Sequence, residues 1–299
     1  SGEVLEFRRS NLEKNTVGYA FAHDPIDWFI GSEGTLGVIV EAELALLPLP
    51  DRVVGLAIFF ADETDALQFV VDARESREVT PRCIEYFDDK AVEIARTSTH
   101  AAGIPGTAAA MVYVEEEVAE DLDSTLGRWV DLTESRASDF DPVVFDGEAK
   151  LRDARKLRHS IPSTMNERGS ARRNAGGRKV STDWAVPYRK LGEAVRIARR
   201  LADDGGIEQA VIYGHAGNGH PHQNFIAGDA AELDTIERVV ERTLREVIRL
   251  GGTVAAEHGI GKIKRKWLPL QMNAIQIAMM SAVKRELDPL GILAPGNIL

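Results

Sequence analysis

Short apolar runs and amphipathic segments alternate along the chain from residue 51 onward. The apolar runs have the length of strands, and the segments between them have helical periodicity. Strands are predicted at 53–60, 82–87, 108–114, 179–186 and 207–213. Helices are predicted at 63–75, 88–97, 117–134, 186–202 and 231–250. This alternation of short units predicts an α+β fold, an antiparallel sheet with helices covering one side.

The two ends of the chain carry less regular patterns. Residues 3–7 and 38–47 have the composition of strands, the second ending at Pro48. Residues 150–173 form a strongly charged helix in which most arginines should be exposed, and 271–287 form a packed helix. Methionines at helical spacing in that last segment indicate core packing rather than cofactor contacts.

A hairpin rich in histidine is the strongest candidate for chemistry. Val211 and Ile212 lead into a loop of small residues bracketed by His215 and His222, and Phe225 leads out. If the two histidines face each other, their Cβ atoms lie about 4.5–5.5 Å apart. Both imidazoles then reach one metal ion at roughly 2.0–2.1 Å. Asn224 shares that face because strand side chains alternate.

A second motif follows about thirty residues later, beginning with Glu257 and His258. Glu257 offers an oxygen ligand, and a set of two histidines and one glutamate leaves a position open for substrate, as in catalytic zinc sites. His258 is then available as a general base. The alternative is that these histidines have only a structural role and hold the loops together.

Charge and composition exclude several classes of function. The 299 residues carry a formal charge of −11, which argues against nucleic-acid binding. No apolar run has the length of a membrane span, and the first residues of this sequence lack the basic and apolar regions expected of a signal peptide. The one cysteine, Cys83, fits a reducing cytoplasm and a buried structural role. The basic run of Lys262, Lys264, Arg265 and Lys266 is interpreted mainly as a solvated helix face.

Four motifs together resemble a known family. They are Phe29-Ile-Gly-Ser-Glu-Gly-Thr-Leu-Gly-Val-Ile-Val40, the 214–224 hairpin, the 257–261 motif and the closing 288–299 segment. These motifs, in this order, resemble those in the C-terminal half of FAD-linked oxidases of the vanillyl-alcohol oxidase type. The branch in question contains D-lactate, glycolate and D-2-hydroxyglutarate dehydrogenases. The resemblance implies a ferredoxin-like substrate domain at 51–270, the end of an FAD-binding domain at 1–50 and a C-terminal helix and tail at 271–299 that return to the flavin side.

The resemblance also implies roles for single residues. Arg158 would grip the carboxylate of a small 2-hydroxy acid, with Lys179 and Asn224 nearby. Metal ligands would be His215, His222 and Glu257, holding zinc or manganese, and His258 would take the hydroxyl proton. FAD contacts would come from the glycine-rich loop: Gly31, Ser32, Glu33, Gly34 and Gly37.

The sequence departs from the family pattern in three respects. No Gly-Gly-Gly loop for the FAD pyrophosphate is found, so we expect weak or no FAD binding and no catalysis without an N-terminal FAD-binding half. Asn218 replaces an aspartate that could orient a ligand imidazole. His220 replaces an asparagine and is a further candidate for the site. A metal-dependent hydrolase and a non-catalytic binding domain are the alternative functions.

Overall fold

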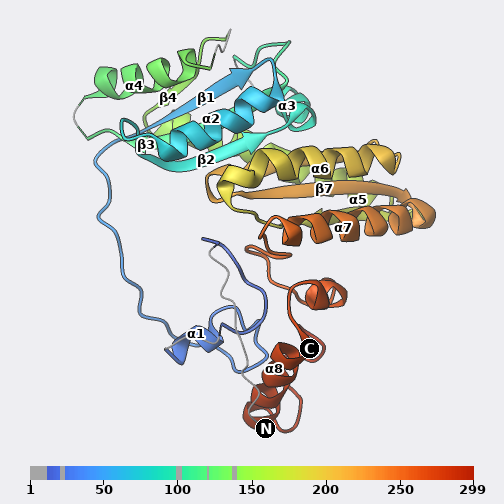
Figure 1. Ribbon diagram of the computed structural model, residues 1–299. Coiled ribbons are helices and arrows are strands. Elements are labelled where there is room, and N and C mark those ends of the chain that lie inside the picture. The colour runs from blue at the N-terminus through green and yellow to red at the C-terminus, as the bar shows by residue number, and fades with distance from the viewer. Residues whose placement is uncertain (1–11, 21–23, 99–102, 120, 137–139) are drawn as a thin grey trace.

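The computed structural model describes residues 12–20, 24–98, 103–119, 121–136 and 140–299. Seven strands form one antiparallel sheet in the order β4-β1-β3-β2-β6-β7-β5 (Figure 1). The strands are β1 (Val53–Phe60), β2 (Pro81–Phe87), β3 (Ala110–Glu117), β4 (Val143–Asp146), β5 (Gly176–Thr182), β6 (Ala210–His215) and β7 (His220–Asp229). The predicted α+β class and the antiparallel, ferredoxin-like sheet are confirmed.

Helices cover both faces of the sheet, so the expectation of a single covered side is wrong. One face packs against α2 (Glu63–Glu75), α4 (Leu122–Glu134), α6 (Leu191–Asp204) and α7 (Ala230–Arg249). The other packs against α3 (Asp89–Arg96) and α5 (Glu148–Ala171). The reason lies in the strands. Leu56 and Ile58 of β1 point to the first face and Ala57 and Phe59 to the second, and a strand apolar on both faces needs cover on both.

Polar caps account for several differences between predicted and observed helix starts. Asp121 accepts a hydrogen bond from the Ser124 N–H, so α4 begins at Leu122 and the residues up to Glu117 belong to β3. The predicted 186–202 helix begins only at Leu191, after a 3₁₀ turn. The short edge strand β4 was not predicted.

The predicted strand at 38–47 is wrong, and the one predicted at 3–7 lies outside the described residues. After the short helix α1 (Ile26–Phe29), residues 37–50 run without regular structure to β1 (Figure 1). Val40 and Leu47 are 91% and 92% exposed. In the described parts of the chain no strand lies beside this segment, and a strand exists only when a neighbour pairs with its backbone groups.

The last helix, α8 (Ala274–Leu287), is less packed than predicted. It begins three residues late because Asn273 and Gln276 form a capping box. Met280 is its one buried residue, and Ile275 is exposed. The chain around Tyr19 and Thr35 lies beside this helix (Figure 1). There the Lys284 Nζ donates to the Thr35 carbonyl oxygen over 2.8 Å.

Candidate metal and substrate site

The β6–β7 hairpin places three histidines on one face, in a register that differs from the predicted one. His215 pairs with His220, whereas His222 pairs with Tyr213. His215 and His222 are therefore diagonal rather than opposite. The period of two along β7 keeps His220 and His222 on the same face. The three rings are neighbours, with the centroids of His215 and His222 5.3 Å apart and those of His220 and His222 4.8 Å apart.

Two glycines make this packing possible. Gly214 has a φ of 125°, and a Cβ at this position would lie 2.8 Å from Cδ2 of His222. Gly219 closes the turn with a φ of 65°, and a Cβ there would lie 2.0 Å from the Val186 carbonyl oxygen. Any side chain at Gly214 would push the His222 ring out of place.

The 257–261 loop brings Glu257 to the histidines. One donor atom from each of His215, His222 and Glu257 lies within 4.8 Å of the other two. Nε2 of His215 is 3.3 Å from Oε2 of Glu257. The fully buried Asp183 holds the loop, since its Oδ2 accepts the backbone N–H groups of Glu257 and His258 over 3.0 and 2.7 Å.

Lys264 forms an ion pair with the same aspartate. It is nearly buried, so this member of the basic run does not belong to a solvated helix face as predicted. A side chain of this kind is rarely buried without a partner, and Asp183 provides that partner.

The electrostatics of the site suit a divalent cation. Burial, with the neighbouring rings, lowers the pKa of His222 to about 4 and that of His220 to about 2. Burial raises the pKa of Glu257, but the charges of Lys14 and His215 outweigh it and the net pKa is lowered. Two imidazole nitrogens and one carboxylate oxygen are a donor set that zinc or manganese accepts. Nδ1 of His222 is buried without a hydrogen-bond partner in the described part of the chain.

Glu85 and Arg158 complete the site from two other elements. Oε1 of Glu85, on β2, lies 2.7 Å from Nδ1 of His215, and its Oε2 lies 3.0 Å from Nε of Arg158 on α5. Burial raises the pKa of Glu85, but the hydrogen bond and charge of His215, together with the charge of Arg158, lower it overall. Sequence analysis missed Glu85 and Asp183. The sequence signal that could have identified them is a carboxylate within or next to an apolar run, where a charge is costly to bury.

The other predicted substrate residues, Lys179 and Asn224, differ in their surroundings. Lys179 binds the Asn166 side-chain oxygen over 3.0 Å, and it lines a cavity of about 630 Å³ at the edge strand β5. Asn224 is fully buried, and its amide is engaged by Ser181 and by the Tyr213 hydroxyl. Because Asn224 is fully buried, a direct substrate contact would require the residues around it to move.

His258 and His220 differ in exposure. The His258 side chain is 53% exposed and its ring stacks on that of His222, with centroids 5.1 Å apart. His220 is fully buried, with Nδ1 3.7 Å from Oε2 of Glu257. Neither His220 ring nitrogen has a hydrogen-bond partner in the described regions. His220 is not part of the close set of three donors.

The glycine-rich loop, residues 31–37, is hydrogen-bonded to the loop of residues 257–261, which carries Glu257. Glu33 has a φ of 56°, and its carboxylate accepts the N–H groups of Ile260 and Gly261 over 2.6 and 2.7 Å. Gly31 and Gly34 also have positive φ values. The stretch from Gly31 to Gly37 thus lies against residues more than two hundred positions away. Its predicted contact with FAD stays a prediction.

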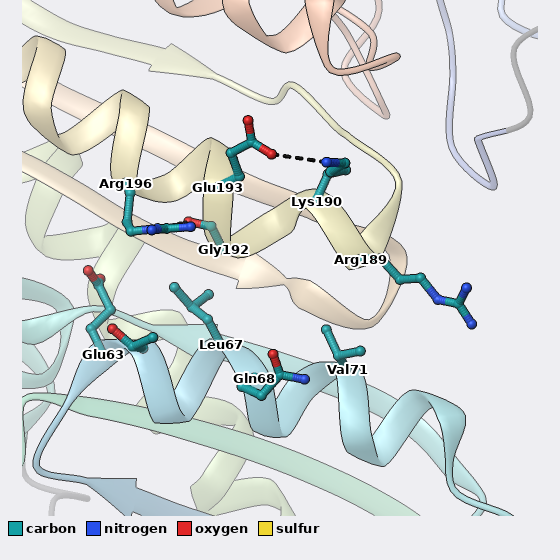
Figure 2. A pocket seen from close by; sticks show the side chains of 10 residues that line it. Glu63, Leu67, Gln68, Val71, Arg189, Lys190, Gly192, Glu193 and Arg196 are labelled. Atoms are coloured by element: carbon teal, nitrogen blue, oxygen red, sulfur yellow. Dashed lines mark hydrogen bonds and ion pairs between the residues drawn. The ribbon is translucent and has the colours of Figure 1, made fainter.

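A separate hollow of about 210 Å³ lies between α2 and the start of α6 (Figure 2). Charged side chains such as Arg189, Arg196 and Glu63 surround it, and Lys190 pairs with Glu193 over 3.1 Å. None of the predicted site residues lines this hollow.

Comparison with known protein families matches residues 49–298 to the C-terminal domain of FAD linked oxidases. The chain belongs to this family. Among characterised FAD-linked oxidases, it is 30% identical to a D-2-hydroxyglutarate dehydrogenase from Xanthomonas citri, covering 100% of this chain and 61% of the relative. It is 27% identical to the glycolate oxidase subunit GlcD of Bacillus subtilis, covering 100% and 61%. A D-lactate dehydrogenase from Archaeoglobus fulgidus is 29% identical, covering 96% and 59%.

The chain thus spans about three fifths of the length of these relatives. Solved structures agree on the fold. Alkyldihydroxyacetonephosphate synthase superposes with a TM-score of 0.59 at 16% identity, covering 92% of this chain and 49% of the other. Substrate-bound p-cresol methylhydroxylase superposes with a TM-score of 0.61 at 14% identity, covering 84% and 53%. Within the described residues, no helix combines the length and apolar character needed to cross a membrane.

Proposed function

We propose that this chain is the substrate- and metal-binding region of an FAD-dependent dehydrogenase that oxidises a D-2-hydroxy acid of the lactate or glycolate kind. The observation that carries the proposal is the convergence of His215, His222 and Glu257 within 4.8 Å, beside the guanidinium of Arg158. The names of the relatives support the substrate class, since they act on glycolate, lactate or 2-hydroxyglutarate.

Each residue has a defined task in this proposal. His215, His222 and Glu257 would hold a zinc or manganese ion, and such an ion would supply Lewis-acid polarisation of the substrate hydroxyl. Arg158 binds the substrate carboxylate, and Lys179 adds a second positive charge. His258, the most exposed of the clustered imidazoles, accepts the hydroxyl proton. FAD supplies the acceptor for the hydride.

An FAD-binding part is the proposed partner of this chain. Two observations support it: the greater length of the relatives and the exposed apolar side chains of the 37–50 segment, including Val40 and Leu47. Large apolar side chains exposed together mark an interaction surface. The chain alone is then expected to be inactive.

The proposed location is the cytoplasm. The single cysteine supports a reducing compartment, which cell fractionation would test.

The deciding experiment uses the full-length gene product under anaerobic conditions. D-2-hydroxy acids should bleach the absorbance of the oxidised flavin, and chelation of the metal should slow this reaction. The His258→Ala variant should slow bleaching by about 10²–10⁴-fold, the usual contribution of a general base. Replacement of His159, on the same helix as Arg158, serves as the histidine control.

Three results would count against the proposal. Unchanged bleaching in His258→Ala would refute the assignment of the base. Ester or amide hydrolysis by the metal-loaded chain, with no flavin reduction, would favour the hydrolase. Absence of metal by elemental analysis, with no change in stability on adding zinc or manganese, would favour a non-catalytic binding domain.

A further inference from the structure

We propose that Glu85 is a positioning residue that aligns two groups of the site at once, the imidazole of His215 and the guanidinium of Arg158. The inference deepens the proposed function and rests on it. Glu85 lies in the middle of β2, where its neighbours Ile84 and Tyr86 are buried in the core. A carboxylate in such a strand is costly unless it is paired.

The first link is to the metal ligand. With Oε1 of Glu85 2.7 Å from Nδ1 of His215, the ring donates its Nδ1–H to the carboxylate. The lone pair is then on Nε2, the nitrogen that lies 3.3 Å from Glu257. Metal-binding histidines usually donate their second ring nitrogen to a carboxylate or carbonyl, which sets the tautomer and the ring orientation.

The second link is to the residue that binds the substrate carboxylate. Oε2 of Glu85 and Nε of Arg158 form an ion pair at 3.0 Å, outside the angular range of a hydrogen bond. Nη2 of Arg158 lies 3.4 Å from each ring nitrogen of His215. The guanidinium therefore lies against the imidazole. Within the described residues, its Nη1 group donates no hydrogen bond and can bind a substrate carboxylate.

Glu85 itself is poorly placed to be a metal ligand. Its side chain is 7% exposed, and one oxygen faces His215 while the other faces Arg158. Asn218, in the turn of the hairpin, donates to Glu13. Glu85 on β2 is the carboxylate that faces Nδ1 of His215.

The test is a zinc titration of the whole chain by calorimetry. Glu85→Gln should bind zinc about 10–100-fold more weakly than the unsubstituted chain, the usual cost of losing such a partner. Glu115→Gln is the matched control. Glu115 is also a buried strand carboxylate paired with an α5 arginine, since it lies 3.3 Å from Arg155. Its loss should leave zinc affinity unchanged.

Two further measurements distinguish a positioning role of Glu85 from a role in stabilising the fold. With zinc bound, NMR of the unsubstituted chain should show the ring proton of His215 on Nδ1. In the full-length gene product, Glu85→Gln should raise the concentration of D-2-hydroxy acid needed for half-maximal flavin reduction, whereas Glu115→Gln should not. The NMR result decides the question even if Glu85→Gln fails to fold.

The outcomes distinguish this inference from the proposed function. If the unsubstituted chain takes up no zinc or manganese, the proposed metal site fails and the role of Glu85 with it. If zinc binds and Glu85→Gln binds it equally well, Glu85 is not a positioning residue, although the metal site stands. An Nε2–H tautomer of His215 would also overturn the inference alone.

Discussion

Replacing Asp183 by asparagine tests what holds the loop of residues 257–261 in place. The substitution keeps the shape of the side chain and removes its charge. Asp183 is fully buried, accepts two backbone N–H groups from Glu257 and His258, and pairs with Lys264. An asparagine can keep the backbone contacts through its carbonyl oxygen, but its NH₂ group would then face the lysine ammonium.

The expected loss is about 3–5 kcal/mol of unfolding free energy, the usual cost of leaving one member of a buried ion pair without its partner. Lys264 is only 9% exposed, so water replaces the lost carboxylate poorly. That loss is a large share of the roughly 5–15 kcal/mol that stabilises a typical protein. Replacing the lysine as well, in Asp183→Asn with Lys264→Met, removes the unpaired charge and should restore part of the stability.

Urea unfolding followed by far-UV circular dichroism measures these differences. The control is Glu237→Gln, which breaks exposed pairs with Lys266 and Arg178. The side chains of Glu237 and Lys266 are 33% and 46% exposed, and a loss of about 0–1 kcal/mol is expected. The reasoning fails if Asp183→Asn costs no more than this control. It also fails if the double variant is as unstable as Asp183→Asn alone, because the unpaired lysine would then not be the cause.

Other predictions concern the hairpin, the cysteine and a helix cap. Gly214→Ala should weaken zinc binding in calorimetry because its Cβ would meet His222 at 2.8 Å, whereas Gly127→Ala, with open space around it, should not. Burial and the charges of nearby glutamates raise the pKa of Cys83 to about 12, so its thiolate stays scarce until the pH approaches that value. Labelling at pH 8 should be roughly a hundredfold or more slower than for a free thiol, and labelling at the free-thiol rate would contradict this. Asp229→Ala removes the cap of α7 and should lower the unfolding free energy by about 0.5–2 kcal/mol; an unchanged thermal midpoint would refute that.

The sequence determined features that depend on neighbours along the chain. The strand Val53–Phe60 and the helix Glu63–Glu75 were predicted with the bounds observed, because apolar spacing is a local signal. The common face of His222 and Asn224 follows from the period of two in a strand. The family followed from motifs that are each continuous in sequence.

Tertiary structure alone decided which distant residues meet. Glu85 reaches His215 because β2 pairs with β6, and Lys264 reaches Asp183 because a loop folds back over a buried carboxylate. Residues 38–47 have the composition of a strand, yet they form none, because a strand is defined by the backbone that pairs with it. Local sequence sets the preference of a segment for helix or strand, whereas packing between distant segments sets the partners of each charge.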